Sequence, residues 1–402
     1  MSATRLIICG GGIAGLTAAL CALKAGLEPL VLERAGALSE VGAGLQVGAN
    51  AMKVMASLGL DEAVRAAGHV PEALELRAGE TGKVIFSVRA GEAGRARWGA
   101  YHVNIRRAAL QQVLASALQH RAPGALRLGV EAVDYAETPE GVAVELASGE
   151  NVEADAVIAA DGIHSALRRR FASGKHPEYT GHTALRVVVE ADEKLRALLP
   201  DASVAWAGPK CHAVSYYLHG QRLINFVGVV EQAEPVPEGW HTEASLADAR
   251  AAFAGFAEPV AAILAEATEA RRWGLYDRPP PSRLARGVVA VIGDAAVPMP
   301  PFMAQGASFA IECAWASVWS LTTSDGFAAY EKAMAVRGGR ILEAARRNGR
   351  FFHGKSLPAL AGYAPVRLAA SLSPGIIKQR FDWIYGYDVT AGRDLGTTGL
   401  LA

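Results

Sequence analysis

The pattern of apolar positions switches between strand-like and helical spacing at the start of the chain. An apolar run over residues 6–9 predicts a short buried strand, and apolar residues at 16, 19, 20 and 23 then predict a helix that ends at Gly26. A second apolar run over 29–32 predicts another strand, which Glu33 closes. A strand, a helix and a strand within about thirty residues predict a βαβ unit of a parallel sheet.

Two later stretches repeat the junction of an apolar strand with a turn and a helix. Residues 156–160 precede Asp161-Gly162, and residues 287–292 precede Gly293-Asp294 and a helix that opens near Gly306. Ligands of open α/β folds bind outside the carboxyl ends of parallel strands. Three such strand ends therefore predict one sheet that carries one long ligand.

The glycines after the first strand have the spacing of a dinucleotide-binding turn. In Gly10-x-Gly12-x-x-Gly15, the first glycine permits a tight turn, the second lets a pyrophosphate approach the backbone, and the third lets helix and strand pack closely. The helix N-terminus offers free N–H groups to phosphates, and Glu33 can accept hydrogen bonds from a ribose diol. The pattern predicts dinucleotide binding without separating NAD from FAD.

Composition excludes several other classes of protein. The 402 residues include 40 Lys+Arg and 40 Asp+Glu, a balance that predicts neither a nucleic-acid partner nor an anionic membrane surface. The four cysteines lie far apart without a C-x-x-C pair, which argues against a zinc knuckle and fits a reducing cytoplasm. No signal peptide and no apolar stretch long enough to span a bilayer is present, so we expect a cytoplasmic protein.

The third strand end fits a flavin better than a nicotinamide. Asp294 suits the hydroxyl groups of a ribityl chain. A helix that opens near Gly306 would place its positive end where the pyrimidine ring of a flavin gathers negative charge on reduction.

Together these motifs resemble those of a known enzyme class. The Gly10–Gly15 fingerprint with Glu33, DGIHSALRR at 161–169 and GDAA…P…AQGA at 293–307 resemble the three motifs of the single-component (class A) flavin aromatic hydroxylases, over nearly the whole chain. Local matches resemble the group of salicylate 1-hydroxylase, 3-hydroxybenzoate 6-hydroxylase and 6-hydroxynicotinate 3-monooxygenase. These matches are the stretches 41–50, 106–111, 179–186, 300–312 and 380–389.

The resemblance implies an α/β fold with two interleaved parts and a tail. A Rossmann-like FAD-binding domain of the glutathione-reductase type, similar to para-hydroxybenzoate hydroxylase, is expected to alternate with a β-sheet substrate domain, because residues 185–230 have the pattern of strands. The expected division is 1–70, 100–175 and 280–320 for FAD, 71–99 and 176–279 for substrate, and 321–402 for a C-terminal helical region. The basic run RGGRILEAARRNGR in that region is expected to be a solvated or interface helix face.

The resemblance also assigns a set of FAD-binding residues. The Asp161-Gly162 motif is associated in the family with both FAD and NAD(P)H. The positions expected to contact FAD are Gly10, Gly12, Ala14, Gly15, Glu33, Arg34, Ala43, Gly44, Arg107, Gln111, Val130, Asp161, Gly162, Gly293, Asp294, Gly306 and Ala307.

Candidate catalytic residues lie on one predicted strand. In HAVSYYL, His212 and Tyr216 share a strand face, and the resemblance implies that they bind and deprotonate a phenol. Gln46, Val297 and Pro301 are expected in the substrate pocket, and Val297 stands where the family usually has histidine. His102, His164, His182 and His353 have no acid or metal-spaced partner in the sequence and are expected to be structural, and no metal is expected.

The resemblance implies a monooxygenase that consumes NADH or NADPH and O₂. It would hydroxylate a small phenolic or hydroxylated N-heteroaromatic acid through a flavin C4a-hydroperoxide, as a monomer or homodimer. A flavin oxidase or dehydrogenase of the same fold remains an alternative, as does a flavin-binding protein without hydroxylase activity, because of Val297. The substrate, the nicotinamide used and whether CO₂ leaves stay open.

Overall fold

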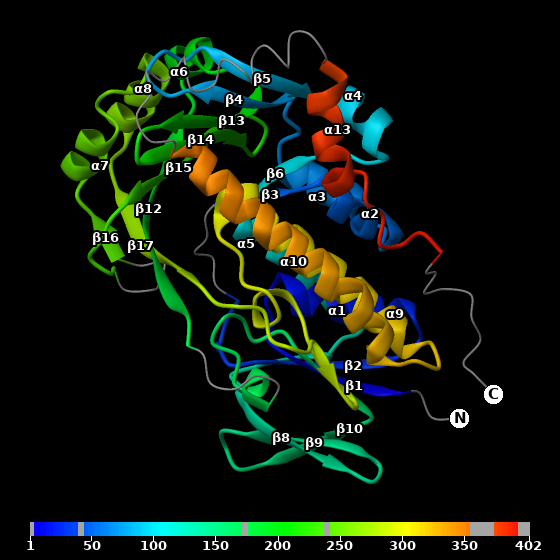
Figure 1. The fold of residues 1–402 in the computed structure, drawn as a ribbon. Helices are drawn as coiled ribbons and strands as arrows, with labels where there is room; N and C mark the ends of the chain where they lie inside the picture. Colours follow the sequence, from blue (N-terminus) through cyan, green and yellow to red (C-terminus); the bar gives the residue numbers. More distant parts are fainter. Residues whose placement is uncertain (1–3, 39–43, 171–175, 237–241, 354–373, 393–402) are drawn as a thin grey trace.

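A six-stranded sheet forms the base of the molecule in the computed structural model (Figure 1), which describes residues 4–38, 44–170, 176–236, 242–353 and 374–392. Its strand order is β18-β19-β11-β1-β2-β7, and all neighbours except β18 and β19 are parallel. The strands are β1 (Arg5–Cys9), β2 (Glu28–Glu33), β7 (Leu126–Leu128), β11 (Ala156–Ala159), β18 (Ala285–Arg286) and β19 (Val289–Val291). The predicted parallel sheet is thus confirmed.

Three helices pack around this sheet. The predicted first helix is α1 (Ile13–Lys24), and α5 (Arg107–Arg121) and α9 (Gly306–Leu321) both contact it. Leu16 and Leu20 of α1 are fully buried. Because α1 lies between β1 and α9, it is apolar on nearly every side, as expected of a helix inside a core.

An eight-stranded, mostly antiparallel sheet forms the second half, in the order β16-β17-β12-β15-β14-β13-β4-β5. One face packs against α6 (Glu193–Leu198), α7 (Leu246–Ala252) and α8 (Glu258–Glu266), seen at its outer side in Figure 1. Its strands are β4 (Ala73–Ala78), β5 (Val84–Arg89), β12 (Glu178–Glu190), β13 (Ala202–Gly208), β14 (Cys211–Leu218), β15 (Leu223–Glu231), β16 (Thr242–Ala244) and β17 (Ala270–Asp277). Because the strands of this sheet come from residues 71–99 and 176–279, we propose that these two segments form the substrate domain. The remaining segments then form the FAD-binding domain and the C-terminal region.

Two smaller sheets complete the strands of the described residues: a three-stranded antiparallel sheet on the far side of the six-stranded sheet (Figure 1), and a two-stranded one, β3 paired with β6. Their strands are β8 (Ala132–Thr138), β9 (Gly141–Leu146), β10 (Asn151–Ala154), β3 (Gly44–Val47) and β6 (Val103–Arg106). The short helices are α2 (Ala49–Ser57), α3 (Asp61–Ala67), α4 (Gly91–Trp98), η1 (Leu167–Arg170), η2 (Gly293–Ala295) and η3 (Pro301–Met303).

Two C-terminal helices join the halves. The long α10 (Phe327–Phe352) runs from β18 to β13 and so crosses from one sheet to the other, and α13 (Pro374–Tyr385) packs on α2 and β5 (Figure 1). Of the two expectations for the basic run of α10, a solvated or an interface face, Arg337 fits the interface: it is 8% exposed and pairs with the buried Glu312 of α9. Within the described residues, no helix has the length and apolarity to cross a membrane.

Candidate functional site

The glycine turn after β1 closes against the neighbouring strands. Gly10 has φ +112°, and a Cβ there would lie 2.4 Å from the carbonyl oxygen of Ala160, beside the second motif. A Cβ on Gly15 would lie 1.9 Å from the carbonyl oxygen of Gly10, so only glycine lets α1 start this close to the turn. The roles predicted for these two glycines match their packing.

Gly12 differs from the other two glycines because its space is open. No protein atom lies within 4 Å of where its Cβ would be, and it is the N-cap of α1 without a side-chain cap. Ala14, half-buried, follows in the first helical turn. The uncapped N–H groups and the bare Gly12 backbone form a place where a phosphate can approach closely.

Glu33 is fixed at the carboxyl end of β2 by the same turn. Its two carboxylate oxygens accept hydrogen bonds from the backbone N–H of Gly11 (2.6 Å) and of Ala35 (2.8 Å). The N–H of Val130 donates to the Glu33 carbonyl at 2.9 Å, which brings the predicted adenine-side residue beside it. Arg34 is exposed next to them.

The third motif meets the first in space. A Cβ on Gly293, which has φ +59°, would lie 3.1 Å from Cβ of Ala14, so the turn after β19 touches α1. Asp294 presents an exposed side chain there. Arg107, at the start of α5, is the cation whose charge acts on this carboxyl. Gly306 and Ala307 begin α9 beyond this turn.

Polar atoms without partners gather at the same strand ends. Oδ2 of Asp161 accepts from the N–H of Ala166 (2.9 Å), but its buried Oδ1 has no partner among the described residues, and burial raises the pKa of this carboxyl. Gln111 donates to the Gly11 carbonyl at 2.8 Å and leaves its own Oε1 unpaired. At Gly162 (φ +81°), a Cβ would have no neighbour within 4 Å.

These residues fit a dinucleotide. The open Gly12 backbone offers N–H donors to a phosphate. The exposed Asp294 and the orphaned oxygens of Asp161 and Gln111 offer acceptors to hydroxyl or N–H groups of a ligand along the same edge. Gly44, also predicted to contact FAD, donates its N–H to Asn225 of β15 at 3.0 Å, at the junction of the two sheets. Ala43 lies outside the described residues.

A cavity of about 480 Å³ lies on the inner face of the eight-stranded sheet. Strands β4, β5, β13 and β14 form one wall, while η3, α10 and α13 form the other, and Gln46 and Pro301 line it as expected. Most of its lining is apolar, with Val214, Phe86 and Phe302 among the contributors. Its size and apolar walls suit a small aromatic molecule.

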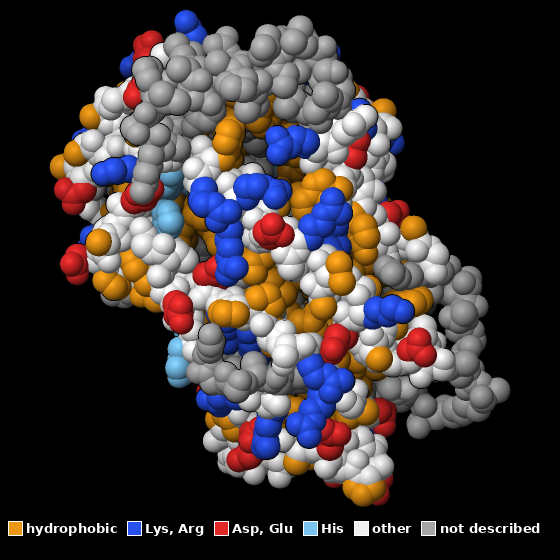
Figure 2. All heavy atoms as spheres, in the orientation of Figure 1, with side chains coloured by type: hydrophobic (Ala, Val, Ile, Leu, Met, Phe, Trp, Pro, Cys, Tyr) orange, Lys and Arg blue, Asp and Glu red, His pale blue; other side chains and the backbone are white. Residues whose placement is uncertain are grey.

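Two arginines give this cavity a positive rim. Arg347 of α10 and Arg380 of α13 line it, are exposed, and have no hydrogen bond or ion pair to another described residue. Figure 2 shows Lys and Arg side chains along the course of α10, among hydrophobic ones. The acid in the lining, Glu75, is already bound to Arg77 at 2.7 Å. Neither arginine was singled out from the sequence, although both lie in stretches noted there, because a charged residue on a helix does not reveal what it faces.

The predicted catalytic pair lies beside the cavity rather than in its lining. His212 and Tyr216 flank Val214 on β14; both are buried, which lowers the pKa of His212 and raises that of Tyr216. The imidazole of His212 packs against Phe302 and Phe352, which do line the cavity. Val297 is also outside the lining, in the main core, because its side chain points toward Gly338 of α10.

The expectation that His182 and His353 have no acidic partner is wrong. His353, after α10, lies with Nδ1 3.4 Å from Oε1 of Glu231 and Nε2 2.6 Å from Nδ1 of His212. His182 packs its ring against His353. Folding brings these groups together from β12, β14, β15 and the end of α10, so sequence spacing carries no trace of the cluster.

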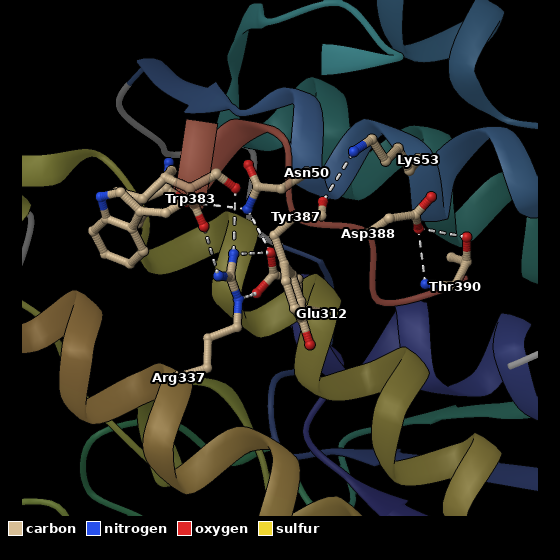
Figure 3. A network of polar contacts seen from close by, with 10 residues as sticks. Asn50, Lys53, Glu312, Arg337, Trp383, Tyr387, Asp388 and Thr390 are labelled. Carbon is tan, nitrogen blue, oxygen red and sulfur yellow. Dashed lines mark hydrogen bonds and ion pairs between the residues drawn. The ribbon is translucent and has the colours of Figure 1, made fainter. Parts of the chain in front are cut away.

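A buried polar network holds α13 over the cavity. Figure 3 shows Arg337, Glu312 and Asn50 pointing toward one another: Arg337 pairs with Glu312, and Nδ2 of Asn50 donates to Glu312 at 2.6 Å. Arg337 also donates to the carbonyls of Trp383 and Ile384 in α13. Since Trp383 and Tyr385 line the cavity, this network determines the position of one of its walls.

The parallel sheet, its dinucleotide edge and the aromatic-sized cavity define a nucleotide-cofactor enzyme with a covered substrate chamber. Residues 3–326 match the family model described as FAD binding domain, and the chain belongs to that family. It is 35% identical over 393 residues to 3-amino-4-hydroxybenzoate 2-monooxygenase PtmB3 of Streptomyces platensis, covering 96% of each chain. It is 31% identical to the 3-hydroxybenzoate 6-hydroxylase of Klebsiella oxytoca, over 95% of this chain and 96% of that one.

A solved structure agrees with this family. The fold superposes on a salicylate hydroxylase substrate complex with a TM-score of 0.81 and 25% identity over 100% of both chains. The predicted α/β fold with a helical C-terminal segment is confirmed, as is the class: an FAD-dependent aromatic monooxygenase.

Proposed function

We propose that this protein hydroxylates a small phenolic or hydroxylated N-heteroaromatic carboxylic acid in the cavity between the eight-stranded sheet, α10 and α13. One observation carries the choice of an acid. Two arginines, Arg347 and Arg380, line a mostly apolar cavity and have no hydrogen-bond or ion-pair partner among the described residues. A carboxylate that docks on such a guanidinium gains charge-assisted hydrogen bonds, while its ring stays on the apolar walls.

The FAD-contacting roles of the motif residues are part of this proposal. The glycine turn and α1 would hold the pyrophosphate, Glu33 the adenosine ribose, and Asp294 the ribityl chain. Bound FAD, with NADH or NADPH and O₂, supplies the oxygen that is added to the ring. The chain's own task is then to position the ring, exclude water and manage the phenolic proton.

We assign proton acceptance to His212. Its pKa lies well below the ordinary value because it is buried, so the imidazole is neutral and able to act as a base. When Nδ1–H of His212 donates to His353 at 2.6 Å, Nε2 is left to accept the phenolic proton, which must pass Phe302 and Phe352 because His212 lies outside the cavity lining. Tyr216, on the same strand face, would orient that hydroxyl. A deprotonated ring attacks an electrophilic oxygen more readily than a neutral phenol.

The test is NAD(P)H consumption with a panel of hydroxylated aromatic acids and their methyl esters. We expect acids, and not esters, to stimulate turnover and to yield hydroxylated product. Arg347→Gln and Arg380→Gln should raise KM for the acid at least about tenfold, the cost of roughly one charge-assisted hydrogen bond. The control is Arg350→Gln, an exposed arginine of α10 outside the cavity lining.

The same measurements separate the alternatives. Turnover that yields only hydrogen peroxide with every compound of the panel would favour a flavin oxidase. Bound flavin without any NAD(P)H consumption would favour a flavin-binding protein. Equal stimulation by acids and esters would refute the role of the two arginines.

A further inference from the structure

Three potential metal ligands converge at one end of the eight-stranded sheet. His182 on β12 and Glu231 on β15 are directly paired across the antiparallel ladder, and His353 reaches them from the end of α10. One ligand atom from each lies within 4.8 Å of the other two. Residues of three separate elements are therefore aimed at one point.

The second ring nitrogen of each histidine is already occupied. Nδ1 of His182 lies 2.9 Å from the carbonyl oxygen of Thr180, to which it can only donate, so Nε2 of His182 carries a lone pair. Nε2 of His353 lies 2.6 Å from Nδ1 of His212, and either nitrogen can be the donor; when His353 donates, its Nδ1 is left as an acceptor, which is the form that a metal ion requires. A metal-bound histidine is usually held in this way through its other ring nitrogen.

In that tautomer, the atoms of His182, Glu231 and His353 that face one another carry no proton to donate. Nδ1 of the buried His353 has no hydrogen-bond partner among the described residues, and the Glu231 carboxylate lies 3.4 Å from it. In the tautomer in which His353 donates from Nε2, two lone pairs and a carboxylate face one another, an arrangement that a cation stabilises. Ligands about 2.0–2.1 Å from a tetrahedral zinc ion lie about 3.4 Å apart. The Glu231 side chain is 35% exposed, which gives an ion access from solvent.

We propose that His182, Glu231 and His353 bind a divalent transition metal ion, with Zn²⁺ as the best match. Two imidazoles and one carboxylate are ligands that zinc prefers, whereas Mg²⁺ and Ca²⁺ prefer oxygen. Water completes the fourth position. The site joins the end of α10 to β12 and β15, behind Phe302 of the cavity wall.

Occupancy of this site has a consequence for His212, and this step rests on the proposed function. A metal on Nδ1 of His353 displaces any proton there and places the remaining proton on Nε2. Nε2–H then donates to Nδ1 of His212, so the proton of neutral His212 moves to its own Nε2. His212 can no longer accept a proton at that atom. Bound Zn²⁺ therefore inhibits hydroxylation without displacing substrate.

Calorimetric titration of chelator-treated holoenzyme with ZnCl₂ tests the site without turnover. We expect saturable binding of one ion per chain with proton release. Glu231→Gln, an isosteric change at a partly exposed position, and His182→Ala should each weaken the affinity at least about tenfold, the loss of roughly one ligand's contribution. His120→Ala, an exposed histidine at the end of α5, is the matched control and should leave it unchanged.

Equal Zn²⁺ affinity in wild type, Glu231→Gln and His182→Ala would overturn the site, as would the absence of saturable binding in wild type. The consequence is tested separately by turnover. Zn²⁺ should lower kcat of wild type and leave KM for the aromatic acid unchanged, and Glu231→Gln should resist it. Saturable binding without loss of kcat would overturn the inhibition while the metal site stands.

Discussion

Arg337 of α10 and Glu312 of α9 form a two-pronged ion pair inside the protein. Nε of Arg337 lies 2.5 Å from Oε2 of Glu312, and Nη2 lies 2.6 Å from Oε1. Both side chains are buried, and the same guanidinium stacks over the ring of Tyr387 at 3.7 Å. The pair is thus the point where α9, α10 and the segment after α13 are tied together (Figure 3).

Glu312→Gln is expected to lower the free energy of unfolding by about 3–5 kcal/mol, because it leaves the Arg337 charge buried without a counter-ion. Urea unfolding followed by fluorescence measures this. Arg346→Gln is the control: it breaks the pair of Arg346 with Asp277, where the arginine is 44% exposed, and should cost less than about 1 kcal/mol. Equal losses for both variants would show that burial of the first pair has no special effect.

Gly12→Ala is expected to fold and yet bind FAD at least about tenfold more weakly, because its Cβ meets no protein atom but occupies the space that a phosphate would use. Gly36→Ala, also without neighbours within 4 Å but outside the turn, should retain full flavin content. Flavin absorbance per chain and titration with FAD measure both. Full FAD affinity in Gly12→Ala would show that the pyrophosphate does not bind at this turn.

Val297→His is expected to lower the free energy of unfolding by about 1–3 kcal/mol, since the side chain points into the core and a larger polar group must displace neighbours there. Val336→His, at a position 76% exposed on α10, should have no effect. Thermal unfolding compares them. A Val297→His protein of unchanged stability, with altered coupling of NAD(P)H oxidation to product, would instead place this position in the reaction.

Acid should destabilise the protein through buried neutral histidines. Burial lowers the pKa of His102 to about 4, so between about pH 6.5 and pH 4 the unfolded chain binds a proton that the folded chain does not. Stability is therefore present above about pH 6.5 and is lost as pH falls, by about 1.4 kcal/mol per pH unit for this group. His102→Phe should make the pH dependence of unfolding shallower by one proton. The exposed His120→Phe should not.

The sequence was most informative where backbone geometry demands particular residues. Gly10 and Gly15 are recognisable because no other residue fits between β1, Ala160 and α1, and Glu33 because it ends a predictable strand. The cavity wall was not predictable. Arg347 and Arg380 come from helices whose direction depends on the buried Arg337–Glu312 pair, and a charged helix residue looks the same whether it faces water or a substrate.

The histidines show the same limit. His212 was recognisable from strand alternation and resemblance, but its partner His353 is 141 residues away in sequence. Val297 shows a similar limit: its place in the motif predicts the pocket, and the motif carries no information on the contact of its side chain with Gly338. Tertiary packing decides both, and neither local spacing nor composition reports it.

The order of strands in the six-stranded sheet also constrains how the protein matures. β19, which leads into the last motif, can pair with β11 only after residues 289–291 have been made, although β1, on the other side of β11, is made much earlier. The nucleotide-holding edge is thus incomplete on any nascent chain that ends before these residues. The complete edge can form only after the strands that carry the other two motifs have already been synthesised.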